Sequence, residues 1–158
     1  MGLMNSYIDN NIARVKENNY RIRIIGNVDM LDETLAGKVR ELEQLTKDKT
    51  GLSFNIALYY GGRDEIVRAV KKIVDSDRLA AEEITEELLT SCLDTHDIPD
   101  PDLIIRTSGE KRLSNFLIWQ SAYSEVYFCE KYWPDFGIDD LVVAIADYQS
   151  RDRRFGRL

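Results

Sequence analysis

Short apolar segments alternate with amphipathic helical patterns along the chain. The segments at residues 20–25, 52–60, 103–106 and 126–129 have the composition and length of strands. Apolar side chains at helical spacing predict helices at 4–18, 32–49, 64–74, 82–93, 114–124 and 138–152. Gly51, just past one helix, is expected to be its left-handed cap. Strands separated by helices favour crossovers in one sheet, so the predicted fold class is α/β, with a mainly parallel sheet flanked by helices.

Composition limits the size of the protein and the class of its partners. The chain has 158 residues, 44% of them hydrophobic, which predicts a single domain over residues 1–158 with one core. Its net charge is −7, which argues against a nucleic-acid partner. The two cysteines lack the spacing of a metal site or a disulfide framework, so a cytoplasmic location is expected. No apolar run approaches the roughly 18 residues that a membrane span needs.

One predicted strand leads into a glycine-rich turn, Gly61-Gly62-Arg63. Ligands of parallel α/β sheets bind beyond the carboxyl ends of the strands, where this turn is expected. Its two glycines allow the backbone to approach a ligand closely, and the helix that follows attracts anions at its start. An ordinary turn from strand to helix explains the same residues, so the alternatives stay open.

A second loop follows the predicted strand at 103–106 and carries Arg106, Arg112 and Ser114. Ser114 is expected to cap a helix, and its hydroxyl, the helix-start amides and the two guanidinium groups can converge on one diphosphate. The alternative is a solvated loop whose arginines pair with Asp102 or Glu110. The position after a strand and the chemistry of arginine together favour the phosphate site.

Two further features each allow two interpretations. Four of the seven residues from 151 to 157 are arginine, which gives either a solvated tail or a basic arm that closes over an anion. Glu125 lies between Tyr123 and Tyr127, where a carboxylate either holds a metal ion or pairs with an arginine. Aromatic residues are dense from 116 to 136, which suits a core and also a subunit interface.

Four segments resemble the cis-prenyltransferases of the undecaprenyl diphosphate synthase type: Arg21–Gly26, Gly51–Val70, Asp100–Gly137 and Arg153–Gly156. The resemblance implies a transferase of isoprenoid biosynthesis. That family condenses isopentenyl diphosphate onto an allylic diphosphate, with cis geometry and Mg²⁺, to make polyprenyl diphosphates. It also implies a homodimer, with at most peripheral membrane contact through the lipid product.

The resemblance also implies roles for individual residues, although it leaves none with a catalytic role. The substrate-binding residues that it implies are Gly61, Gly62, Arg63, Arg106, Arg112, Ser114, Arg154 and Gly156. Within this set, Arg106, Arg112 and Ser114 bind the isopentenyl diphosphate. Arg154 and Gly156 match a tail motif that reaches the active site of the partner subunit, and the glycine-rich turn lies near the active-site floor. Glu125 is placed at the metal and diphosphate site.

The chain departs from the pattern of that family in two places. Tyr59 stands where the family usually has asparagine, and motifs like H-x-x-x-D-G-N-x-R-W and F-S-x-E-N-x-x-R-P do not occur. We therefore expect an incomplete cis-prenyltransferase fold, its C-terminal portion, without the metal-binding aspartate loop and inactive by itself. The alternative hypothesis is a non-catalytic subunit or truncated fragment that needs a partner chain supplying this loop.

Overall fold

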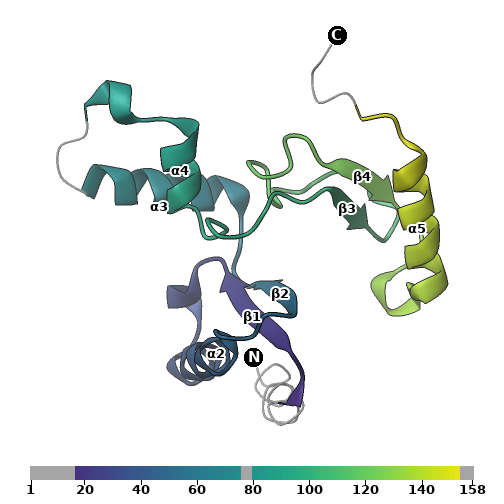
Figure 1. Ribbon diagram of the computed structural model, residues 1–158, viewed down its shortest axis with the longest axis horizontal. Helices are drawn as coiled ribbons and strands as arrows, with labels where there is room; N and C mark the ends of the chain where they lie inside the picture. Colours follow the sequence, from purple (N-terminus) through teal and green to yellow (C-terminus); the bar gives the residue numbers. More distant parts are fainter. Residues whose placement is uncertain (1–16, 76–79, 154–158) are drawn as a thin grey trace. The chain divides into compact units, whose positions relative to one another are not determined.

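The computed structural model describes residues 17–75 and 80–153. They belong to two compact units, unit 1 up to Thr95 and unit 2 from His96 (Figure 1). Each unit contains one pair of parallel strands together with helices. The predicted α/β class with parallel strands is confirmed, whereas a single domain over residues 1–158 stays a prediction. The helix expected at 4–18 lies almost entirely outside the described residues.

Unit 1 is built around β1 (Tyr20–Ile25), α2 (Glu33–Thr46) and β2 (Leu52–Ala57). The two strands are parallel, with Tyr20 opposite Leu52. Asp32 caps α2 by accepting a hydrogen bond of 2.9 Å from the backbone N–H of Leu35. Apolar residues of α2 are fully buried, with Leu35 and Val39 at 0% and 1% exposure, and they form the core of the unit.

Polar side chains of α2 cover the edge of β1 that faces away from β2. The N–H of Ile22 donates to Thr46 Oγ1 at 3.1 Å, and the N–H of Ile24 donates to Glu43 Oε1 at 2.8 Å. Buried backbone donors need such partners, and an uncovered strand edge invites pairing with other chains. One face of α2 therefore supplies both the apolar core and the acceptors that satisfy this strand edge.

Two glycines of unit 1 stand where no other residue fits. Gly26 ends β1 with φ +117°, and a Cβ there would lie 2.0 Å from the carbonyl oxygen of Leu58. A Cβ on Gly51 would likewise lie 2.0 Å from the carbonyl oxygen of Asn19. The expectation that Gly51 is a left-handed helix cap is wrong, because α2 ends at Thr46 and Gly51 is not among the described residues that have positive φ. Gly51 instead allows two backbone segments to approach closely.

The rest of unit 1 is helical. It contains the 3-10 turn η1 (Val28–Met30), α3 (Gly62–Asp75), the 3-10 turn η2 (Ala81–Glu83) and α4 (Glu86–Cys92). Thr85 caps α4 by accepting a hydrogen bond of 3.2 Å from the N–H of Leu88. The glycine-rich segment lies after β2 as expected, but only Gly61 precedes α3, and Gly62 and Arg63 are the first residues of the helix.

Unit 2 contains β3 (Leu103–Arg106), β4 (Glu125–Phe128), the 3-10 turn η3 (Trp133–Asp135) and α5 (Ile138–Ser150). The strands are parallel, with Leu103 opposite Glu125 and Arg106 opposite Phe128. Helix α5 begins after Gly137, whose N–H donates to Asp140 Oδ2 at 2.9 Å. Strand β3 and the start of α5 lie where the sequence predicted them.

The helix predicted at residues 114–124 is wrong, because this segment forms a series of turns. Ser114, Asn115 and Leu117 have φ angles of 50°, 66° and 45°. Residues in the left-handed region cannot continue a right-handed helix. Ser114 therefore caps no helix, and the helix-start amides expected at the phosphate site do not form there.

Candidate functional site

Arg106, Arg112 and Ser114 meet at the carboxyl end of β3, and we call these three residues the Arg106 cluster. Nη1 of Arg106 donates to Ser114 Oγ at 2.9 Å and to the carbonyl oxygen of Arg112. Nε of Arg112 donates to the same Ser114 hydroxyl at 3.1 Å. The three side chains thus lie together, joined at the Ser114 hydroxyl oxygen, whereas their convergence on a diphosphate stays a prediction.

The base of the loop that carries the Arg106 cluster is tied to the chain after β4. The N–H of Ser108 donates to the carbonyl oxygen of Lys131 at 2.7 Å, and the N–H of Gly109 donates to that of Cys129 at 2.9 Å. Ser108 and Gly109 both have positive φ, 75° and 71°, which turns the chain sharply after the strand. The loop therefore leaves β3 in a defined direction, and Arg106 fixes its far side through its own side chain.

Within the Arg106 cluster, Arg112 forms an ion pair and Arg106 forms none with the described residues. Arg112 pairs with Glu110, and the two side chains are 61% and 43% exposed, so the pairing foreseen as an alternative does occur at this arginine. A guanidinium has five N–H donors, and Arg106 uses only Nη1 in its contacts with the described residues. Two adjacent guanidinium groups with donors to spare are suited to binding oxyanions such as diphosphate.

Glu125 forms an ion pair with Arg151. Their Oε2 and Nη1 atoms are 2.6 Å apart, and Arg151 also holds Asp147 Oδ2 at 2.5 Å and the carbonyl oxygen of Val126 at 3.2 Å. The hydrogen bonds to Glu125 and then to Asp147 raise the pKa of the Arg151 guanidinium. Of the two interpretations of Glu125, arginine pairing is the one with a contact in the structure.

The described residues contain no preassembled Mg²⁺ site, although Mg²⁺ is commonly bound by one or two carboxylates together with water and substrate phosphates. Residues 17–75 and 80–153 contain no group of three or more His, Cys, Asp or Glu side chains that could hold a metal ion. Mg²⁺ takes oxygen ligands in a near-octahedral arrangement, and the Glu125 carboxylate is engaged by Arg151. The metal role of Glu125 stays a prediction.

The start of the arginine-rich C-terminal segment is anchored to unit 2. Arg153 Nη1 lies 2.8 Å from Asp102 Oδ1, and its guanidinium lies over the Tyr148 ring, 4.8 Å from the centroid. The hydrogen bond from Arg153 lowers the pKa of Asp102. Asp102 therefore pairs with Arg153, not with the arginines of the Arg106 cluster. Arg154 and Gly156 lie outside the described residues, so their predicted substrate role is not placed.

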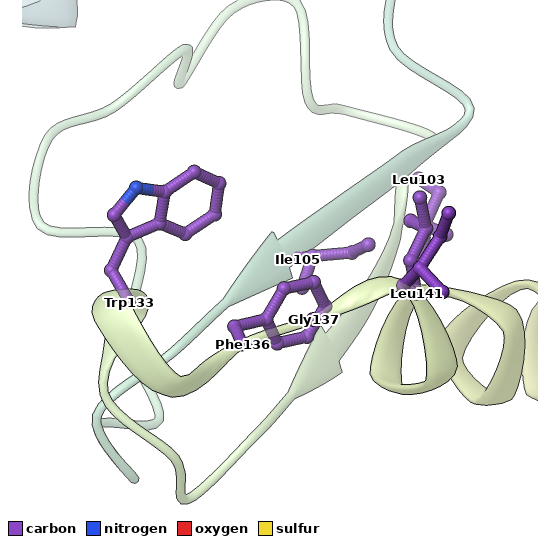
Figure 2. Close-up of a pocket in the computed structure, with 7 residues that line it drawn as sticks. Leu103, Ile105, Trp133, Phe136, Gly137 and Leu141 are labelled. Atoms are coloured by element: carbon purple, nitrogen blue, oxygen red, sulfur yellow. The ribbon is translucent and has the colours of Figure 1, made fainter.

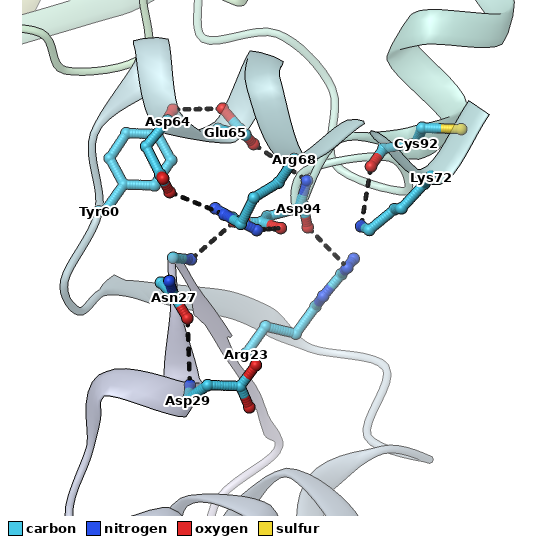
Figure 3. Close-up of polar contacts among 11 residues, drawn as sticks. Arg23, Asn27, Asp29, Tyr60, Asp64, Glu65, Arg68, Lys72, Cys92 and Asp94 are labelled. Atoms are coloured by element: carbon cyan, nitrogen blue, oxygen red, sulfur yellow. Dashed lines mark hydrogen bonds and ion pairs between the residues drawn. The ribbon is translucent and has the colours of Figure 1, made fainter. Parts of the chain in front are cut away.

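The glycine-rich turn leads into α3 in unit 1, whereas the Arg106 cluster belongs to unit 2. Around this turn the structure shows a polar network that the sequence analysis missed (Figure 3). Its members are Arg23, Gly26, Tyr60, Glu65, Arg68 and Asp94. Only the four-residue spacing of Asp64 and Arg68, which pair at 2.7 Å, is visible as a signal in the sequence.

An apolar cavity of about 520 Å³ lies in unit 2 between β3, η3 and the start of α5 (Figure 2). Its walls include Leu103, Ile105 and Leu141, with Trp133 and Phe136, whose rings stack at 6.0 Å. Side chains alternate between the faces of a strand, so Leu103 and Ile105 face away from the side that carries Ile104. The cavity therefore lies on one face of β3, and the buried residue Ile104 lies on the other face.

Comparison with known proteins identifies the family. Residues 1–156 match the family model described as "Putative undecaprenyl diphosphate synthase". The chain belongs to this family. It is 50% identical to the isoprenyl transferase of Agrobacterium fabrum, over all of this chain and 65% of that protein. It is 46% identical to the isoprenyl transferase of Aquifex pyrophilus, over 99% of this chain and 66% of that protein.

A solved structure of the family has the same fold. Lavandulyl diphosphate synthase from Lavandula x intermedia, in complex with dimethylallyl diphosphate, matches with a TM-score of 0.88 and 39% identity. The match covers 98% of this chain and 70% of that one. The chain spans about two thirds, 65%, of the length of the curated relative from Agrobacterium fabrum. Among the described residues, no helix is both long and apolar enough to cross a membrane.

Proposed function

We propose that this chain is a cis-prenyltransferase polypeptide that carries the isopentenyl diphosphate site. In the proposed reaction, the bond between the allylic carbon and its diphosphate breaks, and the double bond of isopentenyl diphosphate attacks that carbon. A proton is then lost, which leaves a product longer by one isoprene unit. Isopentenyl diphosphate keeps its own diphosphate group, so the reaction requires a site that holds this group throughout.

The observation that carries the proposal is the Arg106 cluster at the carboxyl end of β3. Two guanidinium groups share the Ser114 hydroxyl there, with donors directed by a loop whose base is tied down. Arginine holds diphosphate oxygens through planar pairs of charge-assisted hydrogen bonds. In the proposal, Arg106 and Arg112 bind the diphosphate of isopentenyl diphosphate and Ser114 sets the distance between them.

The comparisons support a transferase over a non-catalytic subunit. The curated relatives are named isoprenyl transferases, and the solved relative was captured with dimethylallyl diphosphate, which is an allylic diphosphate. The substrate roles of Gly61, Gly62, Arg63, Arg154 and Gly156, and the requirement for Mg²⁺, remain proposals from the resemblance.

The test is transfer of labelled isopentenyl diphosphate to an allylic diphosphate in the presence of Mg²⁺, with products separated by chain length. The isoprenyl transferase of Agrobacterium fabrum serves as the positive control. The chain is assayed alone and mixed with the aspartate-loop segment of that relative, because the chain alone is expected to be inactive. Product in the mixture supports the proposal, and product from the chain alone refutes the need for the added segment. Absence of product from both, with an active control, would contradict the proposed transferase.

We further propose a cytoplasmic homodimer that packs through the segment from Ser114 to Phe128. Its aromatic residues Phe116, Tyr123 and Phe128 are 40%, 69% and 36% exposed, which is a large apolar surface for one segment. Light scattering at tens of micromolar should give twice the chain mass. A strictly monomeric mass would contradict this assembly.

A further inference from the structure

A buried glutamate closes the glycine-rich turn from both sides. Glu65 is 1% exposed, and its Oε2 accepts a hydrogen bond of 2.6 Å from the hydroxyl of Tyr60. Tyr60 directly precedes the turn and Glu65 follows it by one residue, so this bond spans Gly61 to Asp64. The N–H of Glu65 also donates to the carbonyl oxygen of Gly61 at 2.9 Å. The backbone bond is the first i→i−4 bond of α3, and the side-chain bond connects Tyr60, which precedes the helix, to this first helical turn.

The second oxygen of Glu65 connects this bridge to the end of unit 1. Oε1 accepts a hydrogen bond of 3.0 Å from the N–H of Asp94. The Asp94 carboxylate in turn accepts from the N–H of Gly26 at 2.9 Å, where β1 ends, and from Arg68 at 2.8 and 2.6 Å (Figure 3). Asp94 thus joins the end of β1 to α3, and Glu65 joins Asp94 to the turn.

Because burying a carboxylate costs free energy, the hydrogen bonds that compensate the burial of Glu65 also constrain the backbone near it. A carboxylate with no access to water is stable only when its oxygens are hydrogen-bonded, and both oxygens of Glu65 are. Any displacement of the turn would break the contact with Tyr60 or with Asp94. These contacts hold the start of α3, and with it Gly61, Gly62 and Arg63, against Tyr60 and Asp94.

We propose that Glu65 is a positioning residue, which holds the turn of Gly61, Gly62 and Arg63 in the conformation that the transfer reaction requires. The inference rests on the proposed function, because the turn is among the substrate-binding elements of that proposal. Glu65 touches no substrate in this role. It acts through the turn, with Tyr60 and Asp94 as the groups that fix its two oxygens.

The test compares Tyr60→Phe with Lys72→Met. The first variant removes the hydroxyl that reaches Glu65. The second removes a hydrogen bond of 2.9 Å from α3 to the carbonyl oxygen of Cys92, on the same helix but two turns farther along. Each variant loses one hydrogen bond of a residue in or next to α3, and the melting temperature of each variant is measured so that a general loss of stability can be separated from the local effect. Only the first alters the closure of the turn.

The first measurement is amide hydrogen exchange at Glu65, whose N–H donates to the carbonyl oxygen of Gly61, and it requires no activity. Loss of the Tyr60 hydroxyl should speed exchange at this amide by about five- to tenfold in Tyr60→Phe, and exchange should be unchanged in Lys72→Met. Glu65→Gln keeps a polar group of the same size and should retain the slow exchange. Equal exchange in Tyr60→Phe and Lys72→Met would overturn the proposal.

The second measurement is the transfer reaction, well below the melting temperature of every variant. Tyr60→Phe should lower kcat by about five- to tenfold, with KM for isopentenyl diphosphate unchanged because the Arg106 cluster is intact. Lys72→Met should leave both constants unchanged. An unaltered kcat in Tyr60→Phe would overturn the positioning role. All variants are assayed in the mixture with the aspartate-loop segment, and absence of transfer by the wild type in that mixture would refute the proposed function instead, so that the exchange measurement would decide the role of Glu65.

Discussion

Replacement of Arg106 by alanine tests the substrate site most directly. The change removes the guanidinium whose Nη1 contacts Ser114 and the Arg112 carbonyl oxygen, and it leaves Arg112 on the Ser114 hydroxyl. Charge-assisted hydrogen bonds contribute about 1.5–3 kcal/mol, and every 1.4 kcal/mol changes an equilibrium constant by about tenfold. The dissociation constant for isopentenyl diphosphate should therefore rise by about 10- to 150-fold.

The assay is isothermal titration calorimetry with isopentenyl diphosphate and, separately, with inorganic pyrophosphate. Lys111→Ala is the matched control, because it removes one positive charge from the same loop at an exposed position. An exposed charge is screened by salt, so this control should weaken binding by less than about threefold at 0.15 M salt. Arg106→Lys keeps the charge without the planar pair of donors and should give an intermediate affinity.

Two results would refute the assignment of Arg106. One is undiminished binding of both ligands in Arg106→Ala, with a circular dichroism spectrum like that of the wild type. The other is equal weakening in Arg106→Ala and Lys111→Ala, which would show that only the net charge of the loop matters. Either result would leave the Arg106 cluster as a structural feature of the loop.

Three further predictions concern stability. Burial alone would raise the pKa of Asp94, but the hydrogen bond and charge of Arg68 and the Gly26 N–H lower it below its ordinary value of 3.8. The stabilisation from Asp94 is therefore complete above pH 3.8 and is lost as the pH falls through the lowered pKa. Asp94→Asn should lower the free energy of unfolding in urea at pH 7 by about 1.5–3 kcal/mol and flatten its dependence on pH below 4, and an unchanged pH dependence would contradict the pairing. Tyr59 has φ 46° and is 52% exposed, and asparagine adopts this left-handed conformation more readily than tyrosine. Tyr59→Asn should therefore raise the free energy of unfolding by about 1 kcal/mol, and the control Tyr59→Phe should leave it unchanged. A lower free energy of unfolding in Tyr59→Asn would contradict this prediction. Without Mg²⁺, Glu125→Gln and Arg151→Gln should each lower the free energy of unfolding by about 0.5–1 kcal/mol, because each breaks the same ion pair. Unchanged stability of Glu125→Gln, combined with weaker Mg²⁺ binding, would favour the metal role of Glu125.

Local patterns in the sequence were sufficient for most of the strands and helices. Strands β1 and β3 have the predicted bounds, 20–25 and 103–106, because apolar runs of that length between turn residues have few alternatives to a strand. Helix α5 begins at the predicted residue, Ile138. The meeting of Arg106, Arg112 and Ser114 was also predictable, because a strand end limits where its following loop can lie.

Long-range contacts decided the rest. The apolar spacing at 114–124 suits a helix, yet the side chain of Arg106 holds the Arg112 carbonyl oxygen and the Ser114 hydroxyl, and the chain adopts left-handed residues there instead. Gly51 is explained only by the approach of Asn19, 32 residues earlier in the sequence. A helical or turn pattern reports neighbours within a few residues, so it carries no signal of such contacts.

Long-range contacts also decide the roles of two carboxylates, Glu125 and Glu65. From the sequence, Glu125 could hold a metal or pair with an arginine, and only the tertiary structure brings Arg151, 26 residues away, to 2.6 Å from it. Glu65 gave no signal, because a glutamate in the first turn of a helix is ordinarily solvated. Its burial depends on Tyr60 and on Asp94, and Asp94 arrives from the end of α4. The sequence determines which chemical groups are available, and the packing of distant segments determines which of them lose water and must find partners.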